Sequence, residues 1–145
     1  MTTAVYIAPV SSNKSQGIQM PKEIETHFAL ITLKSDGIVR VVFKADIDFE
    51  IEDAKQLFEV LKSFYKEEKL LVLINTGEGV MISREAREFT ASDEVSAIVK
   101  ADAVVVNNLA TKLLVRAIET NRHTQRLMKL FGTEKEAIGW LKCLK

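Results

Sequence analysis

The chain has 145 residues, of which 47% are hydrophobic and 28% charged, and its 20 basic residues balance its 20 acidic ones. This length suits one globular domain, and the composition excludes disordered and collagen-like chains. Because the net charge is zero, no overall field favours nucleic acid, and we expect no nucleic-acid binding. The single cysteine, Cys143, excludes an internal disulfide.

The N-terminal residues predict neither a signal peptide nor a membrane span. The start, MTTAVYIAPV, lacks a basic region, and its apolar stretch is much shorter than the roughly 20 residues that cross a bilayer. We therefore expect a cytoplasmic protein. Residues 1–26 are largely polar and aperiodic, which indicates a flexible or loosely docked segment before a single domain over residues 27–145. Within this segment, Val5–Ile7 favours a short strand.

Two strands joined by a turn are predicted in FALITLKSDGIVRVVFK. The runs Phe28–Lys34 and Ile38–Lys44 are rich in β-branched and aromatic residues. Asp36-Gly37 between them is typical of a type I′ turn, so we expect an antiparallel hairpin.

An amphipathic helix over residues 50–66 follows. Its apolar residues recur every three or four positions with charged residues between them, at Ile51, Ala54, Leu57, Phe58, Leu61 and Tyr65. Two later runs, Leu70–Ile74 and Ala101–Asn108, are largely aliphatic, which predicts strands buried on both faces of a parallel sheet.

Two short helices are predicted between the aliphatic strands. One runs from about Ser83 to Phe89, and the other has its capping signal at Thr90 and Asp93. The apolar residues of the second helix are Val95, Ile98 and Val99.

The C-terminal third predicts a helix, a strand and a final helix. Asn108 suits the N-cap of the first helix, whose apolar residues are Leu109, Leu113, Ala117 and Ile118. After a short strand at RLMKLF, Thr133 and Glu136 form a capping-box signal for the final helix. The element order β-β-α-β-α-α-β-α-β-α predicts an α/β fold with a mixed five-stranded sheet, made of the N-terminal hairpin and mostly parallel strands, and helices packed on it.

The tail LFGTEKEAIGWL resembles a closing pattern of the STAS family, in which a phenylalanine and a capped helix precede Ala137, Trp140 and Leu141. Together with the element order, it resembles the STAS fold of bacterial anti-sigma-factor antagonists from Phe28 to Leu144, and more closely a divergent branch of small uncharacterised bacterial proteins. The resemblance implies a non-enzymatic regulatory or protein-interaction module. We also expect the final helix to be a structural part of the core rather than a ligand site, with a well-buried Trp140.

The resemblance also points to one loop. In the antagonists, a partner kinase phosphorylates a serine or threonine after a central strand, within an Asp-Ser-Ser/Thr-Gly stretch. Here that stretch falls at MISRE, where Ser83 supplies the hydroxyl and Ile82, Arg84 and Glu85 replace the other family residues. The resemblance therefore implies Ser83 as the candidate phosphorylation site.

The loop INTGEGVMIS leads from the aliphatic strand to Ser83. It lacks the lysine that a phosphate-binding P-loop requires, so Gly77 and Gly79 predict a turn rather than a nucleotide site. Ser83 is also a preferred helix N-cap, and both interpretations stay open. The candidate phosphorylation or partner-loop residues are Ser83, Thr76, Gly77, Gly79 and Arg84.

No catalytic residue, metal site or cofactor is predicted. His27 and His123 are far apart in the sequence and lack neighbours at ligand spacing. A group of basic residues predicts a solvated surface near a helix end, with a surface for an anionic partner as the alternative. A group of acidic residues predicts a solvated first helical turn, with a cation site as the alternative. The basic group is Lys112, Arg116, Arg122, Arg126 and Lys129, and the acidic group is Asp46, Asp48, Glu50, Glu52 and Asp53.

Three functions are compatible with the sequence. The leading hypothesis is a regulatory module that engages a protein partner, a kinase or another regulator, through loop 76–83 and helix 83–89. A homodimer formed through exposed strand edges is a further partner prediction. The alternative is binding of a small apolar or lipid-like ligand between helices and sheet, which a large apolar pocket would favour. An enzyme with scattered site residues ranks last.

Overall fold

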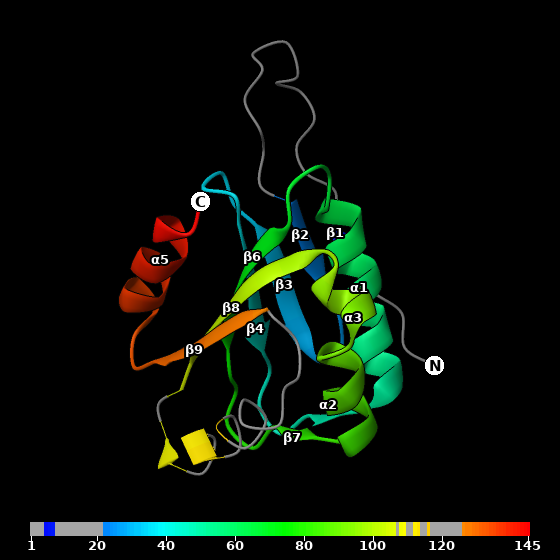
Figure 1. The fold of residues 1–145 in the computed structure, drawn as a ribbon. Coiled ribbons are helices and arrows are strands. Elements are labelled where there is room, and N and C mark those ends of the chain that lie inside the picture. Colours follow the sequence, from blue (N-terminus) through cyan, green and yellow to red (C-terminus); the bar gives the residue numbers. More distant parts are fainter. Residues whose placement is uncertain (1–4, 8–21, 107, 110–111, 114–115, 117–125) are drawn as a thin grey trace.

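A mixed seven-stranded sheet forms the centre of the molecule (Figure 1). The computed structural model describes residues 5–7, 22–106, 108–109, 112–113, 116 and 126–145. The strands of the sheet are β1 (Val5–Ile7), β2 (Lys22–Glu25), β3 (Ala29–Leu33), β4 (Ile38–Phe43), β6 (Leu70–Asn75), β8 (Val99–Val105) and β9 (Leu127–Phe131). They lie in this order, with antiparallel pairing from β1 to β4 and parallel pairing from β4 to β9.

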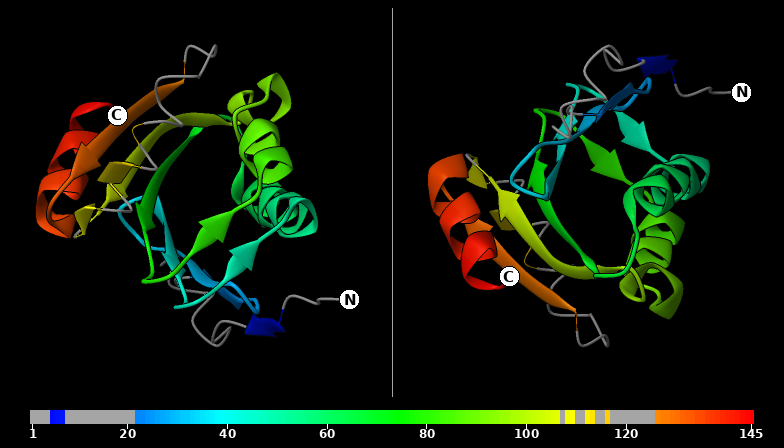
Figure 2. Two further views of the ribbon diagram at one scale, coloured as in Figure 1. Left: turned by 90° about the horizontal axis from the view of Figure 1, so that it is seen from below. Right: turned by 90° about the horizontal axis from the view of Figure 1, so that it is seen from above.

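Helices cover both faces of the sheet (Figure 2). One face carries α1 (Ile51–Phe64), α2 (Arg84–Thr90) and α3 (Asp93–Ser96), and the other carries α5 (Glu134–Cys143). A separate parallel pair joins β5 (Asp48–Phe49) to β7 (Met81–Ile82), just before α1 and α2 begin. Crossover helices of this kind are needed because parallel strands cannot be joined by a tight hairpin.

The predicted α/β fold, with its hairpin and parallel strands, is confirmed, but the sheet has seven strands and not five. The two additional strands, β1 and β2, belong to residues 1–26, the segment expected to be flexible or loosely docked. Ile24 of β2 lies opposite Ile31 of β3, and its side chain is buried. The run KEIE is too short and too polar to have predicted a strand. The sheet therefore includes residues before the predicted domain boundary at residue 27.

The β3–β4 hairpin closes with the loop Ser35–Asp36–Gly37 and not with the predicted type I′ turn. In this loop only Gly37 has a positive φ, 81°, and its N–H donates to the Lys34 carbonyl at 2.9 Å. A type I turn followed by a bulged glycine has this geometry and also matches the twist of a hairpin. The Asp36 carboxylate accepts from the Ile38 N–H at 3.0 Å and so stabilises the turn.

The structure corrects two predicted boundaries near β8. Val99, expected in the second short helix, begins β8, because it already pairs with Leu70. Thr90, expected to cap that helix, is the last residue of α2. Ser92 caps α3 instead, and its hydroxyl accepts from the Val95 N–H at 3.4 Å.

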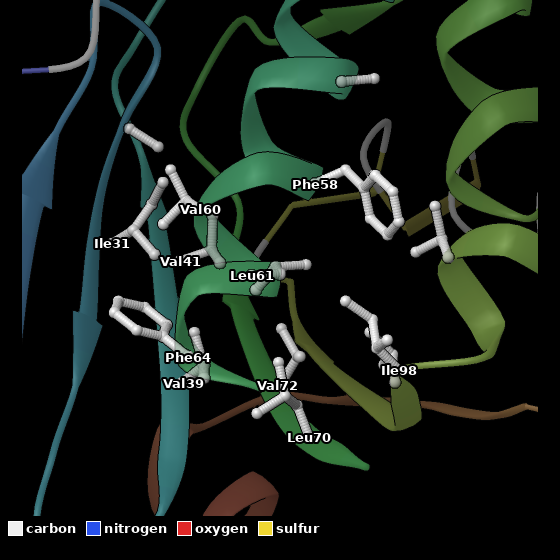
Figure 3. Close-up of a cluster of buried hydrophobic side chains, with 14 of the residues drawn as sticks. Ile31, Val39, Val41, Phe58, Val60, Leu61, Phe64, Leu70, Val72 and Ile98 are labelled. Carbon is white, nitrogen blue, oxygen red and sulfur yellow. The ribbon is translucent and has the colours of Figure 1, made fainter. Parts of the chain in front are cut away.

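The main core lies between the sheet and helices α1 to α3 (Figure 3). Successive strand residues point to opposite faces of the sheet. On β4, Val39 and Val41 face α1, whereas Ile38 faces α5. Burial of an aliphatic or aromatic side chain of this size contributes about 1.5 to 3 kcal/mol relative to exposure. The other core residues that Figure 3 labels are Ile31, Phe58, Val60, Leu61, Phe64, Leu70, Val72 and Ile98.

Helix α5 covers the opposite face of the sheet. Leu141 is completely buried there and belongs to the same cluster as Ala101 and Ala103 of β8, whose small side chains admit the helix. Trp140, expected to be well buried, is only half-buried and lies beside Phe131, with ring centroids 5.6 Å apart. Leu141 is therefore the central residue of this contact.

The final helix begins as predicted, whereas the preceding helix lies mostly outside the described residues. The Thr133 hydroxyl accepts from the Glu136 N–H at 3.2 Å, which is the expected N-cap.

Of the helix predicted after Asn108, residues 109, 112, 113 and 116 are described and helical. Leu109 and Leu113 are 71% and 59% exposed, so they lie outside the core. Arg122 and His123 are outside the described residues.

An ion pair on the α5 side links the hairpin to the final helix. Arg40 is 8% exposed, and its terminal nitrogens donate to the Asp36 carboxylate at 3.1 and 2.8 Å. These hydrogen bonds lower the pKa of Asp36 to about 2. Glu134, the first residue of α5, lies 3.8 Å from the Arg40 Nε.

We expect Leu141→Ala to lower the free energy of unfolding by about 2 to 5 kcal/mol, because it opens a cavity beneath α5. Trp140→Ala should cost about half of the 3 to 5 kcal/mol typical of a buried aromatic residue, because part of the indole already contacts water. Urea denaturation of both variants measures the difference. A larger loss at Trp140 than at Leu141 would contradict this assignment.

We also expect the Asp36–Arg40 pair to make the free energy of unfolding depend on pH in the acidic range. The pKa of Asp36 is lowered from 3.8 to about 2, so its contribution is complete above about pH 4 and is lost as the pH falls toward 2. Asp36→Asn should lower the free energy of unfolding at pH 7 by about 1 to 2 kcal/mol, after solvent screening. It should also flatten the pH dependence between these two values. Parallel urea titrations test this, and an unchanged slope in the variant would rule the pair out as its source.

Candidate functional site

The predicted site loop lies at the carboxyl end of β6. Hydrogen bonds hold it to neighbouring segments on two sides. On one side, the Thr76 hydroxyl donates to the carbonyl of Val105, the last residue of β8, at 3.0 Å. On the other side, the Glu78 carbonyl accepts from the Asp46 N–H at 2.7 Å, and the Met81 N–H donates to the Ile47 carbonyl at 2.8 Å. The loop is therefore fixed between β8 and the segment before β5.

The two glycines of the loop are required by its close packing. A Cβ at Gly77 would lie 2.5 Å from the Lys44 carbonyl oxygen, too near for any side chain. Gly79 has a φ of 74°, and a Cβ there would overlap the Asp46 carboxylate. Asp46 itself has a φ of 58°, so both segments adopt a left-handed residue where they meet. The predicted turn function of the glycines has this structural basis.

Ser83 is the N-cap of α2. Its hydroxyl accepts from the Ala86 N–H at 3.1 Å, and its backbone is extended, with φ of −68° and ψ of 160°. Its own N–H donates to the Phe49 carbonyl at 3.0 Å, which extends the β5–β7 pairing. The capping interpretation of Ser83 is therefore correct, and the phosphorylation site stays a prediction.

The outer surface of this region carries one apolar and several charged side chains. Met81 is 65% exposed. The side chain of Arg84 is 80% exposed and pairs with Glu88 at 3.0 Å, one turn further along α2. Glu78 and Glu85 are exposed beside them. We call residues 76–83 with Arg84, Glu85 and Glu88 the loop–α2 surface.

A cavity of about 110 Å³ lies on the inner side of the same loop, between α1, α2 and the sheet. Thr76, Val80 and Ile82 of the loop line it. Most of its remaining wall is apolar and includes Phe43, Phe49, Leu57, Ile74, Val104 and Met128. The polar side chains that line it, among the described residues, are Thr76, Arg87, Thr90, Asp102 and Arg126.

A buried ion pair forms one side of the cavity. The Arg126 Nε donates to the Asp102 carboxylate at 2.6 Å, and the two side chains are 7% and 5% exposed. A second Arg126 nitrogen lies 3.4 Å from the Ser96 hydroxyl. The solvated surface predicted for the basic group is thus wrong at Arg126. Asp102 within ADAVVV was the available signal, because an acid in a buried strand needs a positive partner.

In the acidic group at the start of α1, Asp53 caps the helix and contacts a histidine. Asp53 accepts from the Glu50 N–H at 3.0 Å, which completes a capping box. Its other oxygen lies 2.6 Å from the His27 Nε2. The Asp53 side chain is 8% exposed and that of His27 is 45% exposed. The cap follows from the three-residue spacing of Glu50 and Asp53, whereas nothing in the sequence indicates the histidine contact.

The described residues offer neither a metal-binding cluster nor a membrane-spanning helix. They contain no group of three or more His, Cys, Asp or Glu side chains placed to hold a metal ion. No helix among them has the length and apolar content required to span a bilayer. Cys143 is exposed at the end of α5.

Residues 31–145 match a protein family described as a domain of unknown function, DUF7793. The chain belongs to this family. No curated protein matches it. A crystal structure at 2.25 Å resolution of an uncharacterised DUF3478 protein from Shewanella loihica PV-4, described as having a SpoIIAA-like fold, is 21% identical with a TM-score of 0.55. The match covers 78% of the DUF7793 chain and 91% of the other chain.

The likeness to that structure confirms the STAS-like fold of this DUF7793 chain. It agrees with the observed arrangement, in which a mixed sheet carries three short or medium helices on one face and a final helix on the other. At this level of identity the likeness concerns the fold alone. The function of the loop–α2 surface and of the cavity has to be argued from their own chemistry.

We expect Ser83→Ala to lower the free energy of unfolding by about 0.5 to 2 kcal/mol, because it removes the cap of α2. Ser83→Asp should be nearly neutral, since aspartate caps as well and suits the positive end of the helix dipole. Thermal and urea unfolding of the two variants test the cap. Equal stability of Ser83→Ala and the native chain would show that water replaces the hydroxyl at no cost.

Proposed function

We propose that this DUF7793 domain is a non-enzymatic regulatory or protein-interaction module whose partner docks on the loop–α2 surface. The observation that carries the proposal is the exposure of Met81, 65%, on a loop whose backbone is held at both sides. A fixed loop on a rigid scaffold can bind a partner without a large loss of conformational entropy. Methionine is enriched in the centres of protein interfaces.

The charges around Met81 support the same interpretation. Arg84 and Glu88 form an exposed ion pair on α2, and Glu78 and Glu85 are exposed nearby. An apolar centre with a charged rim is the usual anatomy of a protein interface. Charges of this kind set the orientation and the association rate of a partner more than its affinity.

The buried acids of the domain support a role without catalysis. Among the described residues, buried Asp53 pairs with His27 and the α1 cap, buried Asp102 pairs with Arg126, and the partly exposed Asp36 pairs with Arg40. These pairs come from different parts of the fold and do not converge on one cleft. General acid and base catalysis requires such groups at one reacting atom.

Phosphorylation of Ser83 is the proposed means of regulating the partner. A phosphate there would still accept the Ala86 N–H, would lie beside Arg84 and would add about 1.5 to 2 negative charges to the loop–α2 surface. Removing this charge from water in the interface is costly, so phosphorylation should weaken the binding of the partner. Self-association is a second proposed contact, since β1 and β9 are the edge strands of the described sheet.

The test is affinity capture from the protein's own cells with matched variants. Met81→Ser combined with Arg84→Glu changes the loop–α2 surface, and Lys135→Glu makes a charge reversal at an exposed residue of α5, on the other face of the sheet. We expect a partner that the native chain and Lys135→Glu retain and that the double variant loses at least tenfold. Binding of the purified partner should show the same ranking. Equal capture by all three chains would disprove docking at this surface.

A second function, small-ligand binding, is favoured by the cavity beneath the loop. An apolar cavity of about 150 Å³ accommodates benzene in another protein, so a cavity of about 110 Å³ has room for only a few non-hydrogen atoms. This volume suits a small apolar group better than the chain of a lipid. The location between helices and sheet is the one predicted for the alternative function.

A further inference from the structure

The polar side chains of the cavity have an uneven charge, and this inference about them builds on the second function proposed above. Among the described residues that line the cavity, Arg87 and Arg126 carry guanidinium groups and Asp102 carries a carboxylate. The net positive charge of these side chains favours an anionic group on the ligand, and the larger apolar part of the wall favours a hydrocarbon part. A molecule that satisfies both has an apolar body and one acidic end.

The two arginines differ in what already binds them. Arg126 is 7% exposed and is neutralised by Asp102 at 2.6 Å. A second carboxylate beside Arg126 would face the negative charge of Asp102, which opposes binding there. Arg126 is thus a poor site for an additional anion.

Arg87 is the better anion site. It is half-buried, and its Nη1 donates to the Ile82 carbonyl at 3.0 Å. Throughout the described part of the chain, no carboxylate lies within ion-pair distance of its guanidinium. Guanidinium groups bind carboxylates through two parallel hydrogen bonds, and Arg87 keeps donors for such a contact.

Thr90 stands next to Arg87 on the same side of α2, three residues further on. Its hydroxyl donates to the Arg87 carbonyl at 3.0 Å and retains lone pairs that can accept from a protonated or hydrated ligand. Leu57, Phe49 and Ile74 supply apolar wall within the same cavity. The cavity thus combines a cationic group and a hydroxyl with a hydrocarbon pocket.

We propose that the cavity binds a small monocarboxylic acid, with the carboxylate on Arg87 and the apolar chain in the pocket. By comparison with the cavity of about 150 Å³ that accommodates the six carbons of benzene, the volume of about 110 Å³ limits the enclosed part to about four or five non-hydrogen atoms. An acid of four to six carbons meets this limit, because about three to five carbons lie beyond its carboxyl group. A long fatty acid exceeds it.

The experiment compares three probes on the full chain by isothermal titration calorimetry at pH 7. Hexanoate tests the acid, hexan-1-ol has the same chain without the charge, and dodecanoate, kept below its micelle concentration, tests chain length. We expect hexanoate to bind at least about tenfold more tightly than hexan-1-ol. Dodecanoate should bind no more tightly than hexanoate.

Substitutions of Arg87 locate the carboxylate. Arg87→Gln should bring the affinities for hexanoate and hexan-1-ol to within about twofold of one another. Arg87→Lys should restore part of the preference, because it keeps the charge but loses the paired donors. Circular dichroism and urea unfolding confirm that both variants are folded.

A matched pair of alanine substitutions locates the chain of the ligand. Ala91 follows α2 and lines the cavity, whereas Ala97 follows α3 and is exposed, and both are the C-cap residues of their helices. Ala91→Leu should fill the pocket and abolish binding of hexanoate and hexan-1-ol. Ala97→Leu should leave both affinities unchanged.

The outcomes separate this inference from the function on which it builds. Absence of binding by all three probes would remove the small-ligand function itself. Equal binding of hexanoate and hexan-1-ol, both abolished by Ala91→Leu, would retain that function and overturn the acid. A preference for hexanoate that survives Arg87→Gln would overturn the assignment to Arg87, and tightest binding of dodecanoate would overturn the size limit.

Discussion

Burial of the parallel strands β6 and β8 on both faces is the constraint on which the rest of the structure depends. Their side chains are covered by α1 to α3 on one face and by α5 on the other. Parallel pairing with β4 also brings the carboxyl ends of three strands to one edge of the sheet. The loop–α2 surface and the cavity both lie at this edge, as ligand sites of open α/β sheets commonly do.

Two buried carboxylates connect segments that are distant in sequence, Asp102 through Arg126 and Asp53 through His27. Asp102 and Arg126 are 24 residues apart, and His27 and Asp53 are 26 residues apart. Ion pairs of this kind add little net stability, because removal from water offsets most of their attraction. Breaking one partner is nevertheless costly, so each pair restricts the ways in which its two segments can pack. Around the cavity, this restriction fixes the start of β9 against β8.

The sequence predicts those features that depend on neighbouring residues. The period of Ile51 to Leu61 shows a helix, and the spacing of Thr133 and Glu136 shows its cap, because both act within a few residues. Strand β2 could not be predicted, since KEIE is stabilised by pairing with β3 and not by its own pattern. Arg87 was missed for the same reason: its place beside a cavity results from the packing of α2 against distant strands.

The loop of residues 76–83 has one side in the cavity and the other on the proposed partner surface. Ile82 lines the cavity and Met81, the adjacent residue, is exposed. A shift of this short β7 segment would therefore change both sites at once. If β7 can adopt two positions and the ligand binds more tightly to one of them, the bound ligand changes the affinity of the domain for its partner. The partner must then change the affinity of the domain for the ligand by the same factor. Because β7 borders both sites, binding of a small molecule in the cavity and binding of a protein on the surface would be thermodynamically coupled.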